Sequence, residues 1–269
     1  MRRRHGWVHW VIWITCGIMG SAPAEVKQLS DNNGPAVRPA TVVPWTGGGA
    51  VLPGWPVDVD PHLSPEPDRA ALLVIDTQVD FLDGGSSTIA GTSAVLPTLA
   101  RLVRGFRAAA RPVVHVVRLY EGADVDLPRR TLIASGAPVV RPGSPGSELA
   151  PDLRPAPGAL LSPRELLAGQ LQPLGDREWA MWKPRWGAFH RTPLDAHLRS
   201  LGVSTVVVAG CNYPNCPRAT VYGASEHDYR TLIARDAVSG VAPLHLEEAA
   251  RMGVLHAATA DILARLPAS

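Results

Sequence analysis

The sequence is poor in cysteine and has no excess of charge of either sign. Its three cysteines, Cys16, Cys211 and Cys216, are too few for a disulfide framework. Lys and Arg number 26 against 24 Asp and Glu, and no basic stripe follows any expected helix, so we expect no nucleic-acid partner. Cys211 and Cys216 have C-x4-C spacing and no matching ligand pair elsewhere, so we expect no bound metal.

No hydrophobic run is long enough for a stable membrane span. The apolar stretch at 7–19 follows three arginines and precedes A-P-A at 22–24, which is the pattern of an export signal. The pattern is imperfect, because His9 and three tryptophans interrupt it. An over-extended start codon is the alternative for residues 1–24, and both interpretations stay open. We favour a cytoplasmic location, and an exported one if 1–24 is a true signal peptide.

Glycine and proline, in contrast, are abundant and gather in two segments. Residues 25–68 show no helical or strand period and predict an extension, whose Gly triplet at 47–49 fits neither G-x-G-x-x-G nor a P-loop. We therefore expect no cofactor. Residues 121–175 are too long for an ordinary connection and predict a functional insertion of unreadable fold. Residues 69–269 then form one domain.

Buried strands alternate with amphipathic helices in that domain. Apolar runs predict strands at 71–75, 113–119, 178–182, 204–209 and 231–234. Helical spacing predicts helices at 95–106, 163–170, 193–201, 219–227 and 246–265. This alternation indicates an α/β fold with a parallel sheet covered on both faces. Active sites in such folds lie beyond the carboxyl ends of the strands.

Three chemically capable side chains follow expected strands: Asp76, Lys183 and Cys216. Pro217 is favoured in the first turn of a helix, which places Cys216 at or beside a helix start. The unpaired amides and positive dipole end there would lower the thiol pKa from about 8.5 and favour the nucleophilic thiolate. An inert buried cysteine is the alternative, and Asp76 could be a turn cap.

Taken together, these residues match a known pattern. The chain resembles the isochorismatase-like cysteine hydrolase family over about residues 69–265. The matching segments are A-L-L-V-I-D-T-Q-V-D-F-L (71–82), K-P-R-W-G-A-F-H-R-T-P-L (183–194), V-V-V-A-G-C-N-Y-P-N-C-P-R-A-T (206–220) and A-R-D-A-V-S-G (234–240). The resemblance implies a Rossmann-like three-layer α/β/α fold with a six-stranded parallel sheet.

The resemblance also implies a catalytic triad of Asp76, Lys183 and Cys216. Asp76 would be general base and then acid, Lys183 would orient it and lower the energy of the thiolate, and Cys216 would form an acyl thioester. The backbone amides of Asn212 and Cys216 would form the oxyanion hole, with a cis peptide bond between Cys211 and Asn212.

Some features depart from better-known members of the family. Isochorismatases proper cleave a vinyl ether without a cysteine, so Cys216 favours C–N hydrolysis. Nicotinamidases carry an Asp-x-His metal motif, and R-L-Y-E-G-A-D at 118–124 lacks it. The N-Y-P-N-C-P-R turn at 212–218 is similar to the branch that contains streptothricin hydrolase.

Several residues near strand ends are candidates for the substrate pocket. They are Arg118, Tyr120, Trp186, Tyr213 and Arg218. Ser225 lacks the second glycine of a nucleophile elbow, which disfavours a serine hydrolase. We expect His115 and His190 to be structural or surface residues.

The sequence thus predicts an amidohydrolase that cleaves an amide, lactam or carbamoyl C–N bond of a small molecule. A non-catalytic ligand-binding protein of the same fold is an alternative, and so is a thiol redox protein using Cys211 and Cys216. A homodimer or homotetramer is expected from the family.

Overall fold

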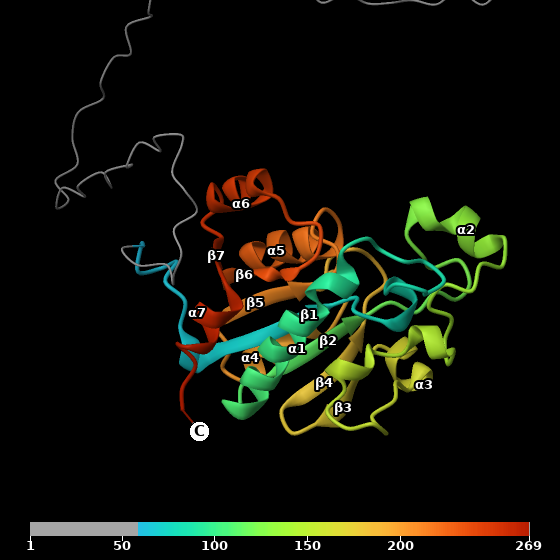
Figure 1. Ribbon diagram of the computed structural model, residues 1–269, viewed down its shortest axis with the longest axis horizontal. Coiled ribbons are helices and arrows are strands. Elements are labelled where there is room, and N and C mark those ends of the chain that lie inside the picture. Colours follow the sequence, from blue (N-terminus) through green and yellow to red (C-terminus); the bar gives the residue numbers. More distant parts are fainter. Residues whose placement is uncertain (1–58, 269) are drawn as a thin grey trace, which may run out of the picture. The chain divides into compact units, whose positions relative to one another are not determined.

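The computed structural model describes residues 59–268, and these contain one seven-stranded sheet (Figure 1). The interpretations of 1–24 and of most of 25–68 fall outside the described residues. The strands are β1 (Ala70–Ile75), β2 (Val113–Val117), β3 (Leu171–Gly175), β4 (Glu178–Trp182), β5 (Thr205–Gly210), β6 (Arg230–Val238) and β7 (Leu255–Ala257). Their order across the sheet is β3-β4-β2-β1-β5-β6-β7.

The expected sheet of six parallel strands needs one correction. Six strands are parallel, but a seventh, β3, pairs antiparallel with β4 at the edge. Strand β3 belongs to the segment 121–175 and contains Pro173, which removes a backbone donor and suits an edge position. Its residues are only half-buried or exposed, so they lack the continuous apolar run that marks the inner strands.

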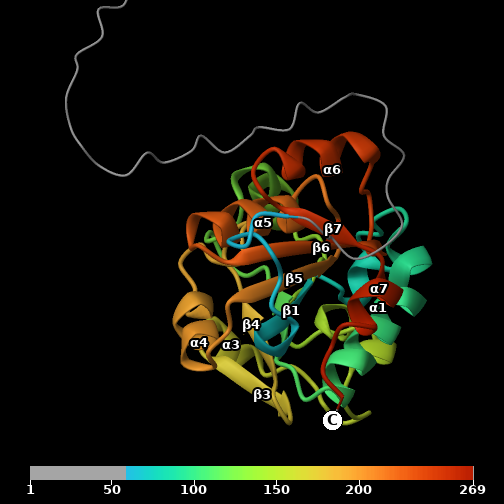
Figure 2. The same cartoon turned by 90° about the vertical axis from the view of Figure 1, so that its left-hand side faces the viewer.

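Helices cover both faces of the sheet, and alternate residues of β1 show why. Ala71, Leu73 and Ile75 pack on one face with residues of α4, α5 and α6, whereas Leu72 and Val74 pack on the other with residues of α1 and α7. Figure 2 shows the two helical layers on either side of the strands. Because both faces are covered, the inner strands are uniformly apolar, which confirms the three-layer α/β/α class predicted from the sequence.

The helices are α1 (Thr92–Ala108), α2 (Arg130–Ala134), α3 (Pro163–Leu167), α4 (Leu194–Ser200), α5 (Cys216–Glu226), α6 (Pro243–Ala250) and α7 (Thr259–Leu263). Helices α1, α3, α4 and α5 lie at the predicted positions, whereas α2 was not predicted and the C-terminal end differs. The predicted helix at 246–265 is wrong, because this region forms α6, β7 and α7. Gly253, at a φ of +76°, adopts the left-handed conformation that ends a helix, and the chain turns there into β7.

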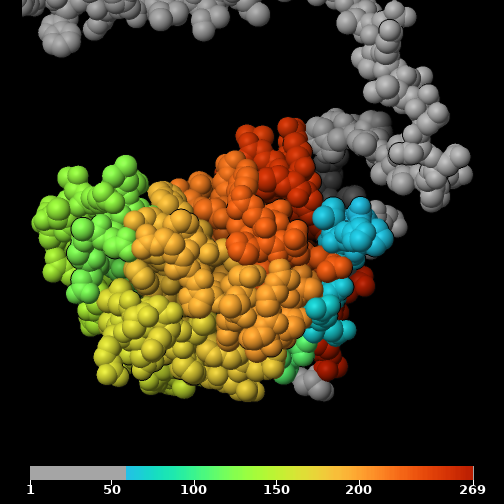
Figure 3. Space-filling model, turned by 180° about the vertical axis from the view of Figure 1, so that it is seen from behind, coloured from blue at the N-terminus to red at the C-terminus, as the bar shows by residue number. Residues whose placement is uncertain are grey.

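Four neighbouring parallel strands, β4, β2, β1 and β5, have their carboxyl ends on the same side of the sheet. Backbone hydrogen bonds continue just past the strands, from Asp76 to the Val116 carbonyl and from Lys183 to the Val117 carbonyl. The parallel register therefore brings the residues that follow these strands together. The segment that carries α2 lies at the far end of the described part from the C-terminal α7 (Figures 1 and 3).

None of the helices within residues 59–268 is both long and apolar enough to cross a membrane.

Candidate active site

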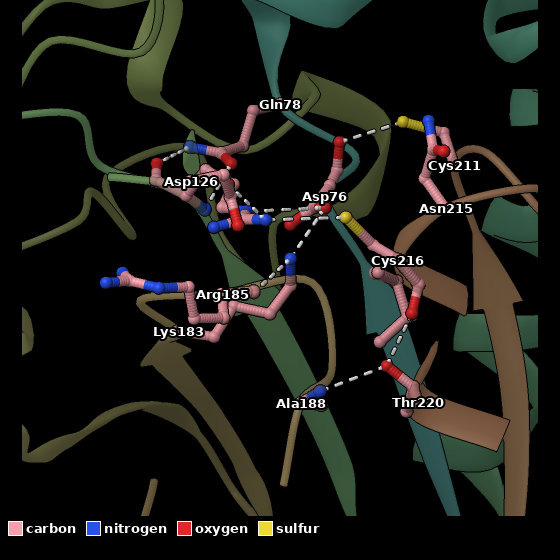
Figure 4. A network of polar contacts seen from close by, with 12 residues as sticks. Asp76, Gln78, Asp126, Lys183, Arg185, Ala188, Cys211, Asn215, Cys216 and Thr220 are labelled. Atoms are coloured by element: carbon pink, nitrogen blue, oxygen red, sulfur yellow. Dashed lines mark hydrogen bonds and ion pairs between the residues drawn. The ribbon is translucent and has the colours of Figure 1, made fainter. Parts of the chain in front are cut away.

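The structure brings Asp76, Lys183 and Cys216 together at the carboxyl end of the sheet (Figure 4). The Lys183 ammonium donates a 2.9 Å hydrogen bond to Asp76 Oδ2, and the Lys183 side chain is fully buried. Asp76 is 4% exposed and Cys216 is 9% exposed. Asp76 Oδ1 is buried and has no hydrogen-bond partner among the described residues. Asp76 and Cys216 both line the same cavity.

Local backbone geometry holds the ends of β1 and β5 close together. Gly210, the last residue of β5, has a φ of +109°, and a Cβ atom there would lie 2.2 Å from the Ile75 carbonyl oxygen. Any other residue at this position would push the nucleophile loop away from Asp76. Asp76 itself has a φ of +48°, a left-handed conformation that Asp tolerates better than most residues. The Cys211 amide donates to the Ile75 carbonyl at 2.8 Å, and the peptide bond between Cys211 and Asn212 is cis.

Cys216 is the first residue of α5, as its position before Pro217 predicted. Thr220, one turn further, donates to the Cys216 carbonyl at 2.7 Å and accepts from the Ala188 amide at 3.1 Å. This threonine therefore ties the start of α5 to the loop that follows Lys183.

The expected low pKa of the Cys216 thiol is wrong for the resting site. Burial raises its pKa, and the Asp76 carboxylate raises it further, while Lys183 and Arg118 lower it by less. The helix start alone does not compensate for removing a thiolate from water and placing it beside a carboxylate.

A small cavity opens beside Cys216. It is lined by Asp76, Phe81, Ile89, Arg118, Tyr120, Asp126, Arg129, Trp186, Cys211, Asn212, Asn215 and Cys216. Three of the five predicted pocket residues, Arg118, Tyr120 and Trp186, are in this lining.

The other two predicted pocket residues lie elsewhere. Tyr213 is buried in the core on the α6 side of the sheet, where its ring stacks on His245 at 5.2 Å. Arg218 lies on the surface of α5 and forms a 2.9 Å ion pair with Glu248 of α6. Proximity to a strand end was too coarse a criterion, because a turn directs successive side chains to different sides.

The most important residue that the sequence did not reveal is Asp126. This carboxylate is 2% exposed and pairs with Arg118 Nη2 at 2.8 Å. It belongs to the segment 121–175, where no periodicity indicates which side chains are buried. Gln78 is also fully buried, and its side-chain amide bonds to the backbone N–H and C=O of Arg118 at 2.8 Å each.

The remaining cysteine and histidines have other surroundings. Cys211 and Cys216 are both free thiols, and Cys211 Sγ donates to the Asp76 carbonyl at 3.2 Å. His115 is fully buried against Glu178 at 2.6 Å, away from the cavity lining, and His190 is exposed. Within residues 59–268 no group of three or more His, Cys, Asp or Glu side chains could hold a metal ion.

Comparison with known proteins agrees with this geometry. The model of the isochorismatase domain matches residues 70–169 and 162–263. Ureidoacrylate amidohydrolase RutB of Methylobacterium radiotolerans is 30% identical over 224 residues, which cover 76% of this chain and 78% of that protein. A protein of Arabidopsis thaliana named as a probable inactive nicotinamidase is 32% identical over 181 residues, covering 65% and 83%.

A solved structure of the isochorismatase family is also similar to this chain. An isochorismatase family protein from Desulfovibrio vulgaris matches with a TM-score of 0.60 and 32% identity, over 74% of this chain and all of that one. A hydrolase-type α/β fold with its polar cluster at the strand ends is thus the class of this protein. The chain belongs to the isochorismatase family. The assignment to the branch that contains streptothricin hydrolase stays a prediction.

Proposed function

We propose that the protein is a cysteine-dependent amidohydrolase that cleaves a C–N bond of a small molecule through an acyl-thioester intermediate. Two observations carry this proposal: Cys216 and Asp76 line the same cavity, and the buried Asp76 Oδ1 has no hydrogen-bond partner among the described residues. An unpaired buried acceptor is costly to folding and calls for an explanation, which the transfer of a proton from the Cys216 thiol would supply.

The roles of the three residues follow from their contacts. Asp76 Oδ1 takes the proton of the Cys216 thiol, and the sulfur attacks the substrate carbonyl carbon to form a tetrahedral oxyanion. The C–N bond then breaks, and Asp76 returns the proton to the leaving nitrogen. Water attacks the thioester, Asp76 takes its proton, and that proton restores the thiol. Lys183, bonded to Asp76 Oδ2, fixes the carboxylate throughout.

The oxyanion formed in this reaction needs backbone donors. We assign them to the amides of Asn212 and Cys216, because both residues line the cavity. Cys216 opens α5, and the first amides of a helix have no partner within it, so the Cys216 N–H is free for such a role.

The cavity and the relatives together suggest where to look for the substrate. The cavity is small, which suits a small molecule rather than a polymer. The similar proteins include a ureidoacrylate amidohydrolase and an N-carbamoylsarcosine amidase from Thermoplasma acidophilum. Ureido acids are therefore the first compounds to test, followed by primary amides and lactams.

The test is a screen of the purified protein for ammonia or amine release from these compounds. We expect at least one compound to be hydrolysed and Cys216→Ala to reduce turnover by about a thousandfold or more. Cys211→Ser is the matched control and should keep most activity, since a hydroxyl can also donate to the Asp76 carbonyl. Equal turnover by Cys216→Ala and the parent protein would contradict the proposal.

A non-catalytic ligand-binding role is the second candidate, because one relative is named as a probable inactive nicotinamidase. It predicts that a compound of the screen stabilises the protein against heat but is never hydrolysed. The redox alternative is disfavoured, because both thiols are free and burial raises the pKa of both.

A further inference from the structure

Arg118 is the cation that contacts the sulfur of Cys216. Its Nη2 atom lies 3.7 Å from Cys216 Sγ, within hydrogen-bond distance for sulfur, and its Nε atom lies 3.9 Å from Asp76 Oδ2. Arg118 Nε is buried and has no hydrogen-bond partner among the described residues. The guanidinium therefore lies beside both the sulfur of Cys216 and the carboxylate of Asp76.

The register of the sheet places Arg118 between the other members of the site. Arg118 follows β2, whose neighbours are β4, which leads to Lys183, and β1, which leads to Asp76. The Gln78 side chain hydrogen-bonds to both the backbone N–H and the backbone C=O of Arg118. The Asp126 carboxylate pairs with Arg118 Nη2 at 2.8 Å. With 3% of its surface exposed, Arg118 has little freedom to turn away from the thiol.

The charge of Arg118 is secure despite this burial. Burial by itself lowers the pKa of the guanidinium, but the nearby Asp76, Cys216, Tyr120 and Asp126 outweigh it and raise the pKa above its ordinary value. An arginine so placed stays protonated at every pH at which the protein is folded.

We propose that Arg118 is a fourth catalytic residue, which stabilises the Cys216 thiolate by a charge-assisted hydrogen bond and is oriented for this by Asp126 and Gln78. This rests on the proposed function. When the thiol proton moves to Asp76, the negative charge moves from a carboxylate bonded to Lys183 to a sulfur bonded to Arg118. Lys183 thus stabilises the negative charge on Asp76 before the proton transfer, and Arg118 stabilises the negative charge on the Cys216 sulfur after it.

The test measures thiol reactivity and needs no substrate. In a Cys16→Ser, Cys211→Ser background, Cys216 is the sole cysteine, and its alkylation rate by iodoacetamide is followed from pH 5 to 10. Arg118→Gln should raise the apparent pKa of Cys216 by about 1 and slow alkylation at pH 7.5 about tenfold. The other titratable groups that face the sulfur, Asp76, Lys183, Tyr120 and Asp126, are unchanged in this variant.

Arg129 offers a matched control, because it lines the same cavity but makes no hydrogen bond to Cys216 Sγ in the described part of the chain. Arg129→Gln should leave the apparent pKa of Cys216 close to that of the parent. Arg118→Lys keeps the charge but lacks the fork that spans Asp126 and the sulfur, so it should alkylate severalfold more slowly than the parent and faster than Arg118→Gln.

The possible results are decisive in both directions. An unchanged pKa profile in Arg118→Gln, or an equal shift in Arg129→Gln, would overturn the role of Arg118. Should Arg118→Gln not fold, an alkylation rate in Arg118→Lys equal to that of the parent would overturn it as well. If Arg118 controls thiol reactivity but no amide is hydrolysed, the proposed function and the catalytic role of Arg118 fail, and only the stabilisation of the Cys216 thiolate by Arg118 stands.

Discussion

Two buried carboxylates lie at opposite ends of the parallel strands, Glu178 at the start of β4 and Asp76 just after the end of β1. They differ in how many of their oxygens are hydrogen-bonded. Glu178 opens β4, and both of its oxygens are bonded, Oε1 to His115 and Arg107 and Oε2 to Arg107, at 2.6–2.7 Å. Asp76 follows β1, and one of its oxygens is bonded to Lys183 while the other is not hydrogen-bonded among the described residues. A buried carboxylate with both oxygens bonded is suited to stabilising the fold, whereas one with a free oxygen near a thiol suits the proton transfer that we propose.

The comparison is tested most strongly by removing the charge of Asp76. Asp76→Asn should reduce turnover of any hydrolysed amide by about a thousandfold, because an amide group cannot accept the thiol proton. Initial rates of ammonia release, measured at a temperature where the variant is folded, check this. A variant that keeps more than about a tenth of the parent rate would exclude Asp76 as the general base.

The reciprocal change is made at Glu178. Glu178→Gln should lower the free energy of unfolding by about 3 kcal/mol, because it leaves Arg107 and the buried His115 without their carboxylate. Turnover below the unfolding transition should stay near that of the parent, because Glu178 does not line the cavity. Urea unfolding and activity measured on the same sample check both parts. A large loss of turnover in the folded variant would contradict the assignment of a purely structural role to Glu178.

The pH dependence of stability gives a third, smaller effect. Burial by itself raises the pKa of Glu178, but the hydrogen bonds from Arg107 and His115 outweigh it and hold the pKa below its usual value. Its contribution is therefore complete above the unfolded-state pKa of about 4.3 and is lost as the pH falls through the lower folded-state value. The difference in unfolding free energy between the parent and Glu178→Gln should shrink on going from pH 6 to pH 3. A difference that grows on acidification would contradict this assignment.

The smallest effects on turnover are expected at Tyr213 and Arg218, the two predicted pocket residues that do not line the cavity. Tyr213→Phe and Arg218→Gln should change turnover by less than about twofold, since neither side chain lines the cavity, and the exposed Arg218–Glu248 pair should contribute under about 1 kcal/mol. Steady-state kinetics on the best substrate of the screen check this. A change in KM of about tenfold in either variant would show that the cavity extends further than the structure indicates.

Much of this site could be predicted because parallel strands align their ends. Continuous apolar runs identify β1 and β5. Asp76 and the turn to Cys216 can therefore be placed at the carboxyl ends of the strands from sequence alone. Strand β7, with three residues, is too short for a readable run, and the predicted helix at 246–265 therefore continued through it. Asp126 was missed for a different reason, because its burial depends on a tertiary contact with Arg118 and not on local periodicity.

The raised pKa of Cys216 was also beyond the sequence. The position of Pro217 identifies a helix start, but it does not show how deeply the thiol is buried or that a carboxylate lies beside it. The burial of the thiol and the positions of Asp76 and Arg118 beside it, on which the proposed mechanism depends, come from the three-dimensional arrangement.

Trapping the acyl group on Cys216 is the decisive experiment for the proposed mechanism. The protein is mixed with its best amide substrate, quenched in acid within the first turnover, and digested, and the peptide that carries Cys216 is weighed by mass spectrometry. The thioester mechanism predicts that this peptide gains the mass of the substrate acyl group, localised to Cys216 and absent in Asp76→Asn. Steady hydrolysis with no adduct on Cys216 at any quench time, together with unimpaired turnover in Cys216→Ala, would contradict it.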